Sequence, residues 1–125
     1  MEKDNMILKK SKRFAVRIIR LYQYLCDEKK EFVLSKQLLR SGTSIGANIR
    51  EAVRGQSRPD FIFKLCISLK EASESEYWLE LLYETGYITQ SEFNSIYPEC
   101  KELVKILTAI IITAKKKEEQ KEKEK

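Results

Sequence analysis

The chain has 125 residues, of which 42% are hydrophobic and 34% charged, and its formal net charge is +5. This length, with only 4 glycines and 2 prolines, fits one helical globular domain and excludes a disordered or low-complexity chain. The sequence has no histidine, so the most common general base and the most common metal ligand are both missing.

The cysteines and the N-terminus indicate where the protein resides. Cys26, Cys66 and Cys100 lie far apart, and their odd number argues against a disulfide framework. No apolar run is long enough to span a bilayer, and the first residues lack the apolar core of an export signal. We therefore expect a cytoplasmic protein with reduced thiols and no contact with a membrane.

The first predicted helix spans residues 6–27. Apolar side chains at Phe14, Ile18, Leu21 and Leu25 recur at helical spacing and predict a buried face. The opposite side carries a row of basic residues with no acidic residue among them: Lys9, Arg13, Arg17 and Arg20. Two interpretations remain open for this row, a solvated face or a contact with phosphates or an acidic protein.

The second predicted helix spans residues 35–55, with Ser35 as its N-cap. Its buried stripe includes Leu38, Ile45 and Ile49, and two glycines lie four residues apart at Gly42 and Gly46. Glycine inside a helix costs about 1 kcal/mol relative to alanine. The two glycines therefore predict that another backbone approaches this helix closely.

The third predicted helix spans residues 59–85, with Gly86 at its C-terminal end. Apolar side chains occur on most of its sides, whereas a helix of a monomeric bundle needs only one apolar stripe. We interpret the surplus as a contact between subunits centred on Trp78, Leu81 and Leu82.

The fourth predicted helix spans residues 89–116 and begins with a capping box formed by Thr89 and Glu92. Pro98 predicts a kink or a delayed start, or a break before a main helix that begins at the proline. The lysine- and glutamate-rich residues 115–125 are expected to be partly helical or disordered. The four segments predict an all-α, antiparallel up-and-down four-helix bundle over residues 1–114.

Polar residues inside the apolar stripes predict a structural network rather than a catalytic site. Glu76 shares the stripe of the third helix and needs buried partners, for which Ser41, Ser44 and Asn48 of the second helix are the candidates. Carboxylates from two helices could hold a metal, but di-iron bundles use Glu-x-x-His motifs and this chain has no histidine. We expect no metal, no cofactor and no enzymatic activity.

Two long motifs carry a family resemblance. QLLRSGTSIGANIREA and, after it, FIFKLCISLKEASESEYWLELLYETGYI resemble the four-helix-bundle proteins that are encoded within intervening sequences of bacterial 23S rRNA genes. The resemblance implies assembly into a ring, a homo-oligomer of five subunits. Related accessory variability determinant proteins of diversity-generating retroelements bind a reverse transcriptase and nucleic acid through a basic surface, which makes both possible partners here.

The charge distribution leads to two hypotheses. Residues 1–58 are strongly basic, whereas residues 59–114 are net acidic. The first hypothesis is an oligomer that binds nucleic acid, most plausibly RNA, through Lys9, Arg13, Arg17 and Arg20, extended by Arg40, Arg50 and Arg54. The second is an oligomeric adaptor for another protein, in which the charge asymmetry serves only head-to-tail self-assembly.

Overall fold

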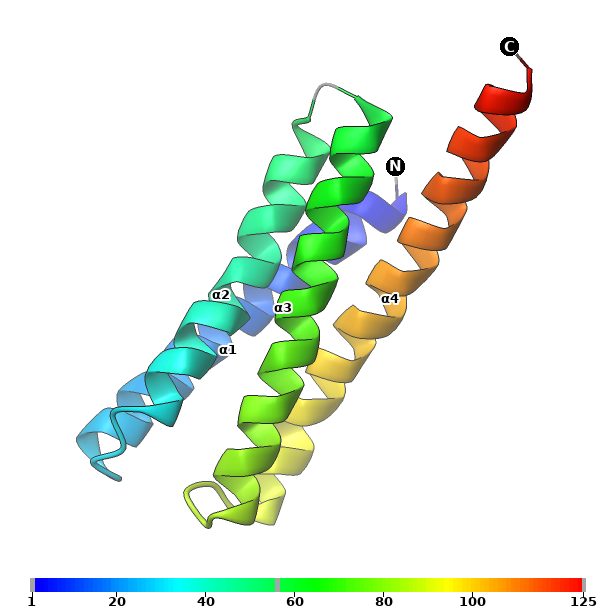
Figure 1. The fold of residues 1–125 in the computed structure, drawn as a ribbon. Coiled ribbons are helices and arrows are strands. Elements are labelled where there is room, and N and C mark those ends of the chain that lie inside the picture. The colour runs from blue at the N-terminus through cyan, green and yellow to red at the C-terminus, as the bar shows by residue number, and fades with distance from the viewer. Residues whose placement is uncertain (1, 56, 125) are drawn as a thin grey trace.

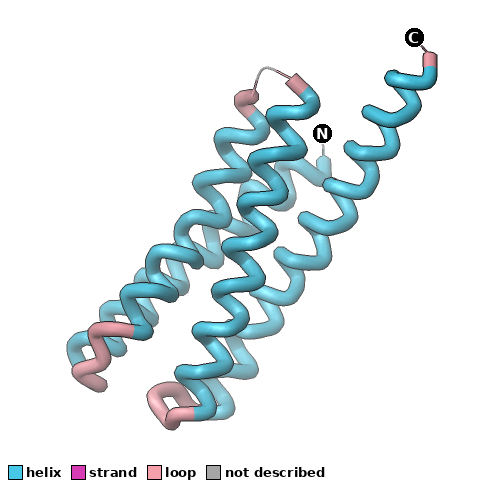
Figure 2. The backbone as a smooth tube through the Cα atoms, in the orientation of Figure 1, coloured by secondary structure: helices cyan, strands magenta, loops and turns pink. Residues whose placement is uncertain are grey.

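Four antiparallel helices lie side by side and are joined by short loops (Figures 1 and 2). The computed structural model describes residues 2–55 and 57–124, with side chains from residue 5 onward. The helices are α1 (Glu2–Asp27), α2 (Leu34–Val53), α3 (Arg58–Glu84) and α4 (Gln90–Lys123). Each packs on the next one in sequence, and the contact between α1 and α4 is the smallest of the four interfaces among the described residues. The predicted up-and-down four-helix bundle is confirmed.

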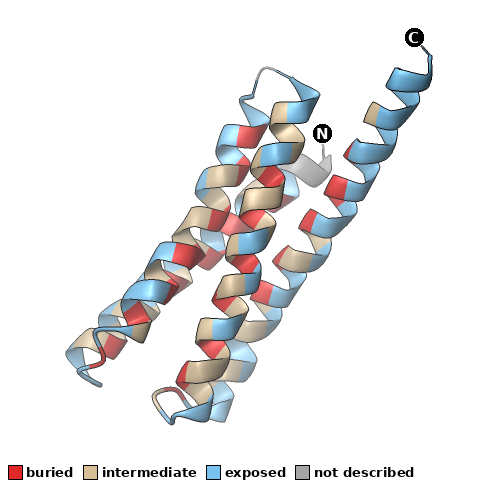
Figure 3. Ribbon diagram, in the orientation of Figure 1, coloured by how far each residue is buried: buried red, intermediate tan, exposed pale blue. Residues whose placement is uncertain are grey.

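The core lies along the inward stripes of all four helices, where the buried residues gather (Figure 3). The sequence stripes of α1, α2 and α4 supply most of it, as predicted. The largest fully buried side chains are Ile7, Phe14, Ile18, Leu25, Leu38, Ile45, Ile49, Leu65, Leu79, Leu82, Leu103 and Leu107.

The two glycines of α2 allow α1 to approach closely. A Cβ atom placed on Gly42 would lie 2.9 Å from both Cγ1 and Cγ2 of Ile18. A Cβ atom on Gly46 would lie 3.2 Å from Oγ of Ser11 and 3.5 Å from its backbone carbonyl carbon. The close contact predicted from the glycine pair therefore exists, and α1 is the partner.

The start of α2 differs from the prediction. The helix begins at Leu34, so Ser35 lies in its first turn and is not the N-cap. The carboxylate of Glu31 caps the helix instead, accepting hydrogen bonds from the backbone N–H groups of Val33 (3.1 Å), Leu34 (3.0 Å) and Ser35 (2.6 Å). The Ser35 hydroxyl donates to the carbonyl oxygen of Glu31 at 2.7 Å. A carboxylate satisfies the free N–H groups of a first turn and also complements the positive end of the helix dipole.

This cap predicts an acid-sensitive contribution to stability. Burial raises the pKa of the Glu31 carboxyl, but the hydrogen bonds from Ser35, Leu34 and Val33 outweigh burial and lower the net pKa. A carboxyl with a lowered pKa stabilises the fold above its unfolded-state pKa, and this stabilisation is lost as pH falls through the folded-state pKa. We expect Glu31→Gln to cost about 1 kcal/mol at neutral pH and progressively less below about pH 4.

Thermal unfolding across this pH range measures the effect, with Glu28→Gln as the control because Glu28 is exposed and lies in the same loop region. A stability difference between Glu31→Gln and the parent that stays constant from neutral to acid pH would contradict the capping role.

The remaining helix ends follow local sequence rules. Ser57 caps α3 by accepting from the N–H of Asp60 at 3.2 Å, with Pro59 in the first turn. Gly86 follows α3 and adopts a φ of +82°, a conformation that residues with a Cβ atom rarely adopt. The predicted capping box is present: the N–H of Glu92 donates to Thr89 Oγ1 at 3.1 Å, and the N–H of Thr89 donates to Glu92 Oε1 at 2.7 Å.

The helix α4 runs without interruption through Pro98, so the predicted break or delayed start is wrong. A proline inside a helix removes one N–H donor and disturbs the carbonyl groups of the preceding turn. The guanidinium of Arg17 in α1 reaches this turn, donating to the carbonyl oxygen of Ser95 at 3.0 Å and to its hydroxyl at 2.8 Å. Arg17 therefore contacts the turn before the proline, although the carbonyl that loses its helical partner is that of Asn94, four residues before Pro98.

The C-terminal part of α4 projects beyond the other three helices (Figure 1). The helix continues to Lys123, past the predicted end at residue 116. The carboxylate of Glu118 lies 3.7 Å from Nε of Arg58, at the start of α3. Among the residues that the structure describes, no helix is long and apolar enough to cross a membrane.

Candidate nucleic-acid interface

The basic row of α1 is interrupted. Lys9, Arg13 and Arg20 are exposed, but Arg17 turns toward α4, where it forms an ion pair with Glu99 in addition to its hydrogen bonds with Ser95. Nearby, Nζ of Lys10 lies 2.9 Å from the carboxylate of Glu102. Arg17 is therefore paired within the bundle, and its place in the binding row stays a prediction.

Arg40 is paired in the same way. Its guanidinium contacts Glu71 at 3.2 Å and also forms an ion pair with Glu74, both on α3. The predicted set of binding residues therefore divides. Lys9, Arg13, Arg20, Arg50 and Arg54 have no carboxylate partner within the described part of the chain, whereas Arg17 and Arg40 link neighbouring helices.

Arg50 and Arg54 line a groove of about 700 Å³ between α1 and α2. Two lysines that the sequence prediction did not include join them, Lys12 on α1 and Lys64 on α3. The sequence contained a signal for Lys12, since it falls on the flank of α1 that also carries Leu8 and Ala15. We name this feature the α1–α2 groove; its lining residues are Leu8, Ser11, Lys12, Ala15, Thr43, Gly46, Ala47, Arg50, Glu51, Arg54, Asp60 and Lys64.

The predicted polar network is only partly brought together. Ser41 of α2 shares a 2.8 Å hydrogen bond with Ser75 of α3. Ser44 and Asn48 instead bond within α2, Ser44 to the carbonyl oxygen of Arg40 at 2.6 Å and Asn48 to that of Ser44 at 2.9 Å. A second bridge between the helices, from the Ser68 hydroxyl to the carbonyl oxygen of Ile45 at 2.8 Å, was not predicted. Inside the bundle, the buried Ser68 and Ser75 of α3, rather than Glu76, bond to α2.

Glu76 faces α4 and not α2, which corrects its predicted partners. One of its carboxylate oxygens lies 3.4 Å from Nζ of Lys101 and is buried without a hydrogen bond in the described structure. Beside it, the Tyr97 hydroxyl donates to the carboxylate of Glu80 at 2.5 Å, and Nζ of Lys101 lies 5.4 Å from the centre of the Tyr97 ring. Burial, followed by this hydrogen bond to Glu80, raises the pKa of Tyr97.

Cys100 lies in the same α3–α4 region. Burial and, to a smaller extent, the negative charge of Glu76 raise the pKa of the Cys100 thiol. The thiol donates a hydrogen bond to the carbonyl oxygen of Ala72 at 3.3 Å. A protonated, buried thiol is a poor nucleophile. Within the residues that the structure describes, no group of three or more Cys, Asp or Glu side chains is arranged to hold a metal ion.

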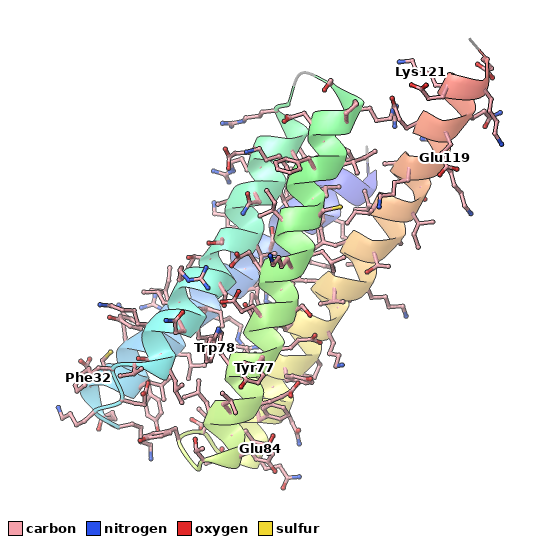
Figure 4. All side chains as sticks on the ribbon, viewed as in Figure 1. Phe32, Tyr77, Trp78, Glu84, Glu119 and Lys121 are labelled. Atoms are coloured by element: carbon pink, nitrogen blue, oxygen red, sulfur yellow. The ribbon has the colours of Figure 1, made fainter. Side chains whose placement is uncertain are left out.

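The three predicted interface residues have different environments. Leu82 is 0% exposed within a single chain, so its assignment to a subunit contact is wrong and it belongs to the core. Trp78 is partly buried against the core, and its indole N–H donates to Glu74 at 3.3 Å; Leu81 is also partly buried. The apolar side chains that α3 does expose are Phe63 (60%) and Tyr77 (54%), and Figure 4 shows Tyr77 next to Trp78 on this helix.

Together, the fold and the groove define an all-α, up-and-down four-helix bundle with a basic surface between its first two helices. The chain belongs to the 23S rRNA-intervening sequence protein family, whose model matches residues 3–109. A crystal structure from Bacteroides thetaiotaomicron, of a protein of unknown function from the S23 ribosomal protein family, is 61% identical in sequence with a TM-score of 0.86. That similarity covers 87% of this chain and 97% of the other. No curated protein matches this chain.

Proposed function

We propose that this protein is a non-enzymatic, homo-oligomeric accessory protein that binds nucleic acid, with RNA as its ligand, through the basic face of α1 and α2. One observation carries the proposal. The bundle neutralises the arginines that face α3 and α4, but it leaves Lys9, Arg13, Arg20, Arg50 and Arg54 without carboxylate partners among the described residues. Unpaired cations supply the counterion release that drives binding to a phosphate backbone.

Binding of short labelled RNAs at several salt concentrations tests this proposal. We expect the logarithm of the binding constant to fall linearly with the logarithm of salt concentration, because each phosphate contact releases condensed counterions. Arg13→Glu with Arg20→Glu is expected to weaken binding to unrelated RNA sequences by a similar factor, because phosphate contacts carry no sequence information.

A matched control is Lys29→Glu with Lys30→Glu, which reverses two exposed charges after the end of α1, away from the basic face. Absence of RNA binding at low salt would refute the proposed function. Equal losses in both variants would show that net charge, rather than this face, determines the affinity.

The exposed apolar surface of α3 supports the assembly part of the proposal and also the alternative function, an adaptor that binds another protein. Phe63 and Tyr77 are more than half exposed on α3, and Tyr77 packs edge-on against the half-buried Trp78, so this helix has apolar surface for a partner to cover. We propose a closed head-to-tail ring of identical subunits, five by resemblance to the family. In such a ring the outer face of α3 contacts the next subunit.

A further inference from the structure

We infer that the α1–α2 groove binds the phosphate backbone of double-helical nucleic acid. This inference rests on the proposed function and specifies both the binding site and the form of nucleic acid. The groove lies between the first two helices and receives cationic side chains from α1, α2 and α3.

The groove is lined by more cationic side chains than carboxylates. Arg50 lies in the last turn of α2 and Arg54 is the residue that caps its C-terminal end, four residues later, so the two side chains start close together on one side of this end. Lys12 faces them from α1. Of the two acidic lining residues, Glu51 lies 3.7 Å from Nζ of Lys64, and Asp60 lies in the first turn of α3, where the helix dipole favours a negative charge. Lys12, Arg50 and Arg54 therefore remain available for an anion.

The floor of the groove consists mostly of small side chains, including Ala15, Gly46 and Ala47. The two hydroxyl groups of the lining already act as donors inside their own helices, Ser11 to the carbonyl oxygen of Leu8 at 3.2 Å and Thr43 to that of Leu39 at 2.7 Å. The ligand must therefore accept its hydrogen bonds mainly from the three free cations. A phosphodiester backbone accepts such bonds, and a floor of small side chains allows it to come close.

None of the described residues that line the groove is aromatic. Proteins that hold single strands commonly stack the bases on aromatic rings, and this stacking offsets the cost of ordering a flexible strand. The exposed rings of Phe63 and Tyr77 belong to α3 and are not part of the lining. A duplex presents its phosphates in a fixed array before it binds, so a groove with cations alone gains more from a duplex than from a single strand.

The experiment compares the affinities of the parent protein and two variants for duplex RNA, duplex DNA and single-stranded RNA of equal length. Lys12→Ala with Arg54→Ala removes one lysine and one arginine from the groove. Lys29→Ala with Lys36→Ala also removes two positive charges, from exposed positions near the loop between α1 and α2 and outside the groove lining, and is the matched control. Circular dichroism checks that both variants keep the helical content of the parent.

We expect the parent to prefer both duplexes to the single strand, because the groove contacts phosphates and no bases. We expect the groove variant to lose about tenfold more duplex affinity than the control variant, and its salt slope to fall by about 2. Single-stranded RNA that binds as tightly as the duplexes would overturn the assignment to double-helical nucleic acid. Equal losses in the two variants would overturn the assignment to the groove. In both cases the proposed function stands, whereas absence of binding to all three ligands would refute the function itself.

Discussion

Replacing Leu82 by alanine is expected to lower the free energy of unfolding by about 2–5 kcal/mol. The side chain is fully buried in the core near the C-terminal end of α3, so its removal loses apolar contacts and leaves a cavity. For a domain of this size, such a loss lowers the melting temperature by many degrees. Thermal unfolding followed by circular dichroism measures this drop in melting temperature.

Tyr77→Ala is the control, because Tyr77 lies on the same helix but is 54% exposed. We expect this variant to keep the helical content of the parent and to lower the oligomer mass measured by light scattering, if the outer face of α3 joins subunits. A Leu82→Ala variant that unfolds like the parent would place Leu82 outside the core. A parent protein that is monomeric at all accessible concentrations would refute the ring.

Replacing Gly42 by valine is expected to cost about 3 kcal/mol, at the upper end of the range for overpacking a core. Even one added carbon would lie 2.9 Å from two carbon atoms of Ile18, which are close to the backbone of α1 and cannot move aside as the end of a long side chain could. The helices α1 and α2 must therefore separate. Chemical denaturation measures the loss.

Two further variants test the cause of this loss. Gly46→Ala, one turn later on α2, adds a carbon 3.2 Å from the Ser11 hydroxyl, so its smaller crowding is offset by the better helix propensity of alanine. Ile18→Ala with Gly42→Val moves side-chain volume from one side of the contact to the other. We expect this pair to be less destabilising than the sum of its single changes. Strict additivity would show that the two residues do not compete for space.

Local patterns predicted the fold well. The apolar stripes and the capping box at Thr89 depend on residues within a few turns of each other. The tight packing at Gly42 depends on the missing side chain of glycine. The start of α2 was missed, because Glu31 caps it from three residues before the helix and a plausible serine lay nearby.

Predictions that depend on the rotation of a helix against its neighbours were less successful. Arg17 falls in line with Lys9 and Arg13 in the sequence, but only the packed bundle brings Glu99 and Ser95 of α4 beside it. Leu81 and Leu82 are adjacent in a helix that is apolar on most sides. The buried stripe of α3 that includes Leu82 was missed because two of its positions, Ser68 and Ser75, are polar. The α1–α2 groove combines residues from three helices, and therefore only the assembled bundle reveals Lys12 and Lys64 as partners of Arg50 and Arg54.

The order in which the helices pack has a consequence for the speed of folding. Every large interface joins helices that are consecutive in the chain, so most native contacts can form by closing short hairpins. Among the described residues, only the α1–α4 interface joins the two ends of the chain, and its polar links connect residues 78 to 92 positions apart. Because this interface is also the smallest, little loop-closure entropy has to be lost before the core forms. We therefore expect the chain to fold quickly, in about the microsecond to millisecond range of helical domains, with the contact between its first and last helices forming last.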